Sequence, residues 1–263
     1  LIETAVMDTD SEADFERALA DRLNAMARRG DLGMGITEQV LRADVGQPMS
    51  DLHQRYREQI EQWPAFMASD IEISLEHRSE PGCLRLDDRL PPARGNADGQ
   101  WLRVVVARSE ILRGEGKRAS YQPRNLFDSW VSHVAANCVG VAVETMVLAK
   151  RGSVRFAALD TARARDLLRA MMDAYMHNLM QPIAMTPGTG FAWLDAIQHD
   201  PEATETALGR AREQFEQDLA LDVGYLRRFQ PDFDLFWTAR SERFVRALYE
   251  PLWQALREDA HEG

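Results

Sequence analysis

Two adjacent carboxylates, Asp87 and Asp88, are the residues of this chain whose types and position are best suited to chemistry. They lie near the end of a predicted strand, residues 83–90. Carboxylate oxygens are good ligands for Mg²⁺, so an acid here could hold a metal ion for phosphodiester cleavage. A charged strand end before the turn at Pro91 and Pro92 accounts for the same residues without any chemistry. The residues of the neighbouring strand decide between a metal site and a charged strand end.

The next predicted strand, residues 101–108, reads WLRVVVAR and contains no acid. A metal-dependent nuclease site needs an acid here and a lysine two positions on, which period-2 alternation puts on one face. The acid would hold Mg²⁺ and the lysine would help to orient the nucleophile. Those positions are Val106 and Arg108, and a valine binds no metal. Asp87 and Asp88 cannot form a competent site alone, so we expect no catalytic residue.

Composition indicates a globular protein with enough chain for a sizeable core, since 45% of the 263 residues are hydrophobic and 28% are charged. The sequence begins at Leu1 without a methionine, and we expect it to be a fragment of a longer chain. It shows no signal-peptide pattern and no apolar run approaching the roughly 18 residues of a membrane span.

Cysteine and histidine usage predicts neither a metal site nor another cofactor. Cys83 and Cys138 lie far apart, which is typical of reduced thiols in a cytoplasmic protein. The six histidines form no close pair, and no Walker motif is present, so we expect no ATP bound through one.

The charge is strongly acidic overall but uneven. The net charge of −11 argues against a freestanding nucleic-acid binder. Residues 76–124 contain ten Arg or Lys and seven Asp or Glu, a net charge of +3, so the remainder carries −14. Basic residues therefore gather around the predicted strands, although an ordinary solvated surface would give the same pattern.

A basic loop, residues 109–124, is the predicted DNA contact. Gly114 and Gly116 leave its backbone flexible, and its cations can neutralise phosphates without reading bases. The tyrosine among them could stack on an unpaired base. A mobile surface loop is the alternative. The predicted DNA-binding residues are Arg113, Lys117, Arg118, Tyr121 and Arg124.

Periodicity and capping residues predict a mixture of helices and strands. Predicted helices cover 11–29, 37–43, 48–63, 123–137, 160–180, 191–198, 201–220 and 241–256. Alternating runs at 70–77, 83–90 and 101–108 predict three strands in an antiparallel meander, because short turns separate them. Residues 141–150 and 153–159 predict a hairpin closed by Arg151 and Gly152.

Residues 124–197 resemble the C-terminal domain of the exodeoxyribonuclease V gamma subunit, RecC. The resemblance rests on the order and spacing of several landmarks across nearly the whole chain. These are Trp130, Val131 and His133, the hairpin VLAKRGSVRFAAL, the helix DTARARDLLRAMMDAYMHNLMQPIAMTP, Phe191-Ala192-Trp193, Asp222 through Phe233, Tyr249-Glu250-Pro251-Leu252, and in the earlier part Leu84–Asp88 and the turn at Asn96–Gly99.

The resemblance implies an α/β (α+β) fold with a restriction-endonuclease-like core, of the PD-(D/E)XK type, whose site is degenerate and which several helices decorate. It implies one domain, 1–263, with a helical lead-in at 1–67, the nuclease-like sheet and helix at 68–160 and a helical part at 161–263. It also implies a non-catalytic subunit of a helicase–nuclease in double-strand-break repair and recombination. RecB-like and RecD-like subunits would be its partners, and it would line a DNA channel.

Two alternatives belong to other functional classes. An active Mg²⁺-dependent nuclease would need acids other than those assigned here. A structural adaptor would hold partner proteins without touching DNA. Cleavage that depends on Asp87 or Asp88 would favour the enzyme, and DNA binding that depends on the cations at 113–124 would favour the channel.

Overall fold

The computed structural model describes residues 9, 11–80, 82–114, 119–183, 185–200, 202–220 and 232–262. Helices and a mixed sheet alternate along this part of the chain, which confirms the predicted α/β class. The helices are α2 (Glu12–Arg29), α3 (Ile36–Gln62), η2 (Pro123–Asn125), α4 (Phe127–Asn137), α5 (Thr161–Met180), α6 (Pro187–His199), α7 (Thr204–Ala220), α9 (Phe233–Phe236), α10 (Ala239–Leu248) and α11 (Glu250–Glu262).

The strands form one five-stranded sheet and two separate antiparallel pairs. Their bounds are β1 (Ala65–Phe66), β2 (Ile71–Ser79), β3 (Gly82–Leu90), β4 (Arg94–Gly95), β5 (Trp101–Val106), β6 (Leu112–Arg113), β7 (Ser120–Tyr121), β8 (Val143–Leu148) and β9 (Ser153–Phe156). The sheet has the order β1-β4-β5-β8-β9, while β2 pairs only with β3 and β6 only with β7.

The predicted three-strand meander is wrong. Strands β2 and β3 do form an antiparallel hairpin, with Ile71 opposite Leu90 and Ser79 opposite Gly82. Strand β5 instead pairs antiparallel with β4 and parallel with β8. Pro91 and Pro92 follow β3 directly, and because proline has no backbone N–H the ladder cannot continue through them. The connection then supplies β4, which takes the place beside β5 that the meander gave to β3.

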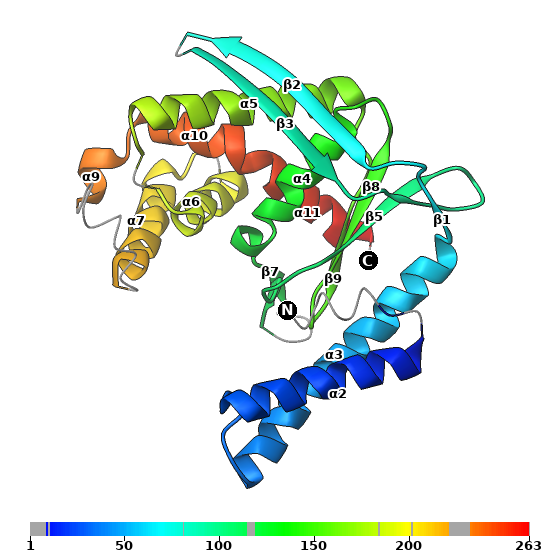
Figure 1. Ribbon diagram of the computed structural model, residues 1–263. Coiled ribbons are helices and arrows are strands. Elements are labelled where there is room, and N and C mark those ends of the chain that lie inside the picture. The colour runs from blue at the N-terminus through cyan, green and yellow to red at the C-terminus, as the bar shows by residue number, and fades with distance from the viewer. Residues whose placement is uncertain are drawn as a thin grey trace.

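Helix α3 also differs from its prediction, because one helix replaces the two expected at 37–43 and 48–63. It runs through Pro48 without a break. A proline inside a helix costs about 3 kcal/mol, so burial must offset it. Met49, Leu52 and Tyr56 follow at helical spacing and are buried with Phe15 of α2 in one apolar cluster. The end of the α2–α3 hairpin that holds the turn projects from the rest of the molecule (Figure 1), while the cluster itself packs on the sheet.

The termini of the other helices follow local signals. Ser11 caps α2, Gly30 ends it at a φ of +81°, and Asp160 caps α5. The predicted helix at 241–256 is two helices, α10 and α11, because Pro251 lies in the first turn of α11, where its missing N–H is not needed. Helix α6 begins earlier than predicted, at Pro187 after the cap Thr186, and α7 begins at Thr204.

The two faces of the five-stranded sheet pack against different helices. On one face, Val104, Val106 and Leu148 join the cluster under α2 and α3. On the other face, Val147 and Phe156 belong to the main core with α4, α5 and α11. The alternation along β5 and β8 that predicted half-buried strands therefore reflects two separate apolar layers.

Candidate nucleic-acid interface

The predicted basic loop is a short hairpin of β6 and β7, with Leu112 opposite Tyr121 and Arg113 opposite Ser120. Lys117 and Arg118, which were predicted to contact DNA, lie outside the described residues. The described part of the loop lines a groove of about 1040 Å³, and residues of α6, α7 and α11 form the rest of its lining. We call this the arginine groove. Its lining residues include Arg113, Tyr121, Arg124, Phe191, Asp195, Gln214, Gln217, Trp253 and Arg257.

Three arginines line the arginine groove. Arg113 and Arg124 come from the predicted loop, and Arg257 comes from α11 at the other end of the chain. All three are exposed, and no hydrogen bond or ion pair joins their guanidinium groups to a described residue. The guanidinium carbon of Arg257 lies 4.6 Å from the centre of the Trp253 ring. A groove with cations free to meet phosphates and with exposed aromatic surface suits a nucleic-acid strand.

Tyr121 is held in place by its hydroxyl group. The hydroxyl donates to the carbonyl of Ser153 at 3.2 Å and to the carboxylate of Asp259. Burial, and then the hydrogen bond and the negative charge of Asp259, raise the pKa of Tyr121 well above its ordinary value. The phenol is therefore neutral at physiological pH, and its polar end joins the hairpin to β9 and α11.

The arginine groove also contains an acid, so its charge is mixed. Asp195 of α6 lines it and accepts a long hydrogen bond of 3.4 Å from the indole nitrogen of Trp253. An adjoining hollow of about 690 Å³ shares Arg113 and Asp195 with it. There Arg210 is paired with Glu213 at 3.4 Å. Free cations are thus concentrated around the loop and α11.

The RecC C-terminal domain family matches residues 4–198. The chain belongs to this family. RecC C-terminal domains are part of the gamma subunit of the RecBCD complex, which acts in DNA repair. No curated protein matches the chain significantly.

The match to the RecC C-terminal domain ends within α6. The resemblance at residues 124–197 falls inside it, whereas the later landmarks, Asp222 through Phe233 and Tyr249 through Leu252, lie beyond it. Arg113 and Arg124 are within the matched part, and Arg257 and Trp253 are not. One wall of the arginine groove therefore comes from the matched residues and the other from the remainder of this chain.

The four positions predicted to form a degenerate nuclease site in this RecC C-terminal domain are divided between two separate sets of strands. Asp87 and Asp88 lie on β3, in the separate β2–β3 pair, while Val106 ends β5 in the five-stranded sheet and Arg108 follows it. The half-buried side chain of Val106 packs against the apolar cluster of α2 and α3.

The two acids have local partners. Asp87 pairs with Arg85 at 2.6 Å and accepts a hydrogen bond from Ser74 at 2.8 Å, and these contacts lower its pKa. Asp88 accepts from the backbone N–H of Arg89 at 2.7 Å. Among the described residues, no group of three or more His, Cys, Asp or Glu side chains could hold a metal ion. No helix in that part of the chain is long and apolar enough to cross a membrane.

The sequence analysis did not predict a buried polar cluster that joins β5 and β8 to α4. Arg103 of β5 is 9% exposed and donates to the carbonyl of Ser132 at 3.2 Å. Beside it, the Nδ1 atom of His133 lies 2.9 Å from the hydroxyl of Thr145. Burial lowers the pKa of Arg103 to about 10, and burial together with the charge of Arg103 lowers that of His133 to about 3. An arginine within the alternating run of β5 was the available signal.

Proposed function

We propose that this chain is a non-catalytic DNA-contacting domain of a RecC-type gamma subunit. The observation that carries the proposal is the arginine groove, where Arg113, Arg124 and Arg257 have no described partner and lie beside the half-buried Trp253. Lys117 and Arg118 of the same loop would add to its positive charge. Phosphates bound there would be positioned without sequence readout. RecB-like and RecD-like subunits are the protein partners that this role requires.

We further propose that the sheet and α4 descend from a restriction-endonuclease-like core. The support is the unit in which β5 leads through α4 to β8 and the two strands pair in parallel, Trp101 opposite Val143 and Val106 opposite Leu148. Val106 at the expected acid position, and the placement of Asp87 and Asp88 in a different strand pair, support an inert site.

Fluorescence anisotropy with labelled single-stranded and duplex DNA tests the DNA contact. The variant Arg113→Ala, Arg124→Ala, Arg257→Ala removes three free cations from the arginine groove. A matched control, Arg22→Ala, Arg28→Ala, Arg243→Ala, removes three exposed arginines elsewhere that also lack described partners. We expect the slope of log K against log salt to fall by about 2–3 in the first variant and by less than about 1 in the control. Equal slopes in both variants would rule out the groove as the DNA contact.

An active nuclease is the competing function, because Asp87 and Asp88 are exposed adjacent carboxylates. The test is cleavage of linear DNA with and without Mg²⁺ by the purified chain and by Asp87→Asn, Asp88→Asn. Our proposal predicts equal, background cleavage in all four reactions. Cleavage that needs Mg²⁺ and is lost in the double variant would replace our proposal with the enzyme. If DNA binding is also absent, the adaptor function remains.

A further inference from the structure

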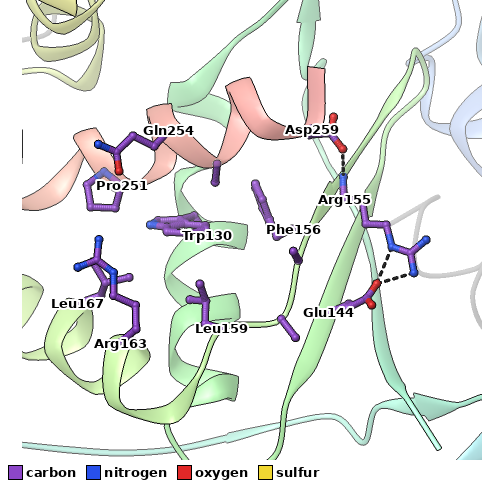
Figure 2. A pocket seen from close by; sticks show the side chains of 13 residues that line it. Trp130, Glu144, Arg155, Phe156, Leu159, Arg163, Leu167, Pro251, Gln254 and Asp259 are labelled. Carbon is purple, nitrogen blue, oxygen red and sulfur yellow. Dashed lines mark hydrogen bonds and ion pairs between the residues drawn. The ribbon is translucent and has the colours of Figure 1, made fainter. Parts of the chain in front are cut away.

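A second cavity, separate from the arginine groove, opens beside the outer strand of the five-stranded sheet (Figure 2). Its volume is about 450 Å³. We call it the edge pocket. Residues from α4, β8, β9, α5 and α11 line it, among them Trp130, Glu144, Arg155, Ala157, Arg163, Leu167, Pro251, Gln254, Ala255 and Asp259. Nothing in the proposed DNA contact uses this cavity.

The first half of strand β9 is covered on its outer side. In an antiparallel strand, alternate residues direct both backbone groups away from the partner strand. Here those residues are Ser153 and Arg155. The carbonyl of Ser153 accepts from the hydroxyl of Tyr121, and the N–H of Arg155 donates to Asp259 at 2.9 Å. These side chains block strand addition at this end, which is a common protection for sheet edges.

The second half of the edge is open. By the same alternation, the carbonyl of Arg155 faces outward, and it bonds to no described residue. The N–H of Ala157, the first residue after β9, also has no described partner. Ala157 and Ala158 are exposed and small, so another backbone could approach closely. An acceptor and a donor thus remain free beside the edge pocket.

The interior of the edge pocket is largely apolar. Trp130 is 3% exposed, and it lines the cavity together with Leu159, Leu167 and Ala255. Burial of apolar surface is the main favourable contribution to such a contact. The edge pocket therefore suits an apolar side chain.

Charge distinguishes one side of the edge pocket from the other. Glu144 and Arg155 neutralise each other, with 2.6 Å from the carboxylate to Nε, and Asp259 is engaged by Arg155 and Tyr121. Arg163, at the side away from the Glu144–Arg155 pair in Figure 2, has a guanidinium group with no described partner. Asp259 accepts only from neutral groups, so it keeps its negative charge at its own side of the cavity. Arg163 is the cation of the lining without a described partner, and it complements a carboxylate at the other side.

We infer that the edge pocket binds an extended segment of a partner chain, which adds to the sheet beside Ala157. The segment inserts an apolar side chain into the cavity and places an acidic residue against Arg163. Backbone pairing at a sheet edge with pockets for alternate side chains is an established mode of peptide recognition. The choice of partner rests on the proposed function, because the segment is sought in the RecB-like and RecD-like chains.

The experiment uses fluorescein-labelled 12-residue peptides that overlap along the RecB-like and RecD-like chains of the same organism. Each is titrated against the full 263-residue chain by fluorescence anisotropy. Two variants change the edge pocket: Arg163→Glu reverses the charge at that position, and Ala255→Met fills its interior. Glutamate is favourable in the first turn of α5, so the first variant should fold. Arg243→Glu, an exposed arginine of α10 outside the pocket, is the matched control.

The inference requires at least one peptide that loses tenfold or more of its affinity in both pocket variants and keeps it within twofold in Arg243→Glu. Hydrogen exchange should then show slower exchange of the Ala157 amide in the complex. If no peptide binds, or if affinity survives both variants, the inference is wrong. DNA binding measured on the same proteins depends on the arginine groove, so its loss or survival tests the proposed function separately.

Discussion

The arginines of the β2–β3 pair and two of the three in the arginine groove come from the basic stretch of the sequence, yet the two regions present their arginines differently. On the β2–β3 pair the cations are neutralised locally. Arg78 pairs with Glu76 at 2.9 Å, and Arg89 pairs with Glu72 of the opposite strand at 3.3 Å. Arg85 pairs with Asp87, as described above. Exposed pairs of this kind contribute little stability, but they occupy the cation.

In the arginine groove the same residue type is left unpaired. Arg113, Arg124 and Arg257 face a common hollow and have no described acidic partner. A cation that is already paired must give up its partner before it can neutralise a phosphate, whereas a free cation need not. The number of basic residues in a segment is therefore a poor guide to DNA contact, and pairing in three dimensions is the better one.

The largest expected effect comes from removing the acids of the β2–β3 pair. Arg89 also lies 3.8 Å from Asp70, so the variant that frees Arg78, Arg85 and Arg89 on one exposed surface is Asp70→Asn, Glu72→Gln, Glu76→Gln, Asp87→Asn. We expect non-specific duplex binding to strengthen, with the salt slope steeper by up to about 2–3. The measurement is anisotropy from 50 to 200 mM salt, roughly the range over which such slopes are resolved. An unchanged slope would show that pairing does not control which arginines meet DNA.

The next effect concerns the aromatic surface of the arginine groove. Trp253→Leu removes the ring that lies under Arg257. If the ring stacks on unpaired bases, single-stranded DNA should lose about 1–3 kcal/mol of binding free energy and duplex DNA much less. Trp101→Leu, which replaces a half-buried tryptophan of β5, is the control. Equal losses for both forms of DNA would assign Trp253 to packing instead of stacking.

Local signals in the sequence predicted the parts of the fold that local interactions stabilise. Ser11 and Gly30 bound α2, Asp160 caps α5, and Gly152 closes the β8–β9 hairpin at a φ of +77°. The neighbours of β5 could not be predicted in this way. Strand pairing is decided by contacts between distant segments, and the alternation of β5 is the same whichever strand lies beside it.

The same limit applies to the candidate site: residues close together in the sequence were predicted, and residues brought there by helix packing were not. A run of cations and glycines predicted Arg113 and Arg124, because those residues are close together in the chain. Arg257 and Trp253 reach the same hollow only because α11 packs beside η2 and β9. The Glu72–Arg89 ion pair of the β2–β3 hairpin was implicit in its cross-strand register. The pairs Arg78–Glu76 and Arg85–Asp87 instead join residues two positions apart on one strand, so counts of basic residues did not show them.

A smaller effect is expected for the residue that joins the arginine groove to the sheet edge. Tyr121→Phe keeps the ring but removes the hydroxyl that bonds to Ser153 and Asp259. We expect the free energy of unfolding to fall by about 1–2 kcal/mol, because Asp259 loses a partner in a half-buried position. DNA affinity should not change if the ring is what meets a base. Urea denaturation and anisotropy on the same preparation separate the two roles.

The smallest effect is expected on the β2–β3 pair. Arg89→Ala breaks the ion pairs with Glu72 and Asp70. The arginine side chain is 65% exposed, and the acids are 77% and 42% exposed. Solvent screens exposed pairs of this kind. The free energy of unfolding should therefore change by no more than about 0.5 kcal/mol, and DNA affinity by less than about twofold. Arg124→Ala, which removes one unpaired cation, should instead lower the salt slope by about 1. If the two single variants behave alike in DNA binding, the distinction between paired and unpaired arginines is wrong, since both remove one exposed guanidinium and differ only in what that group contacts.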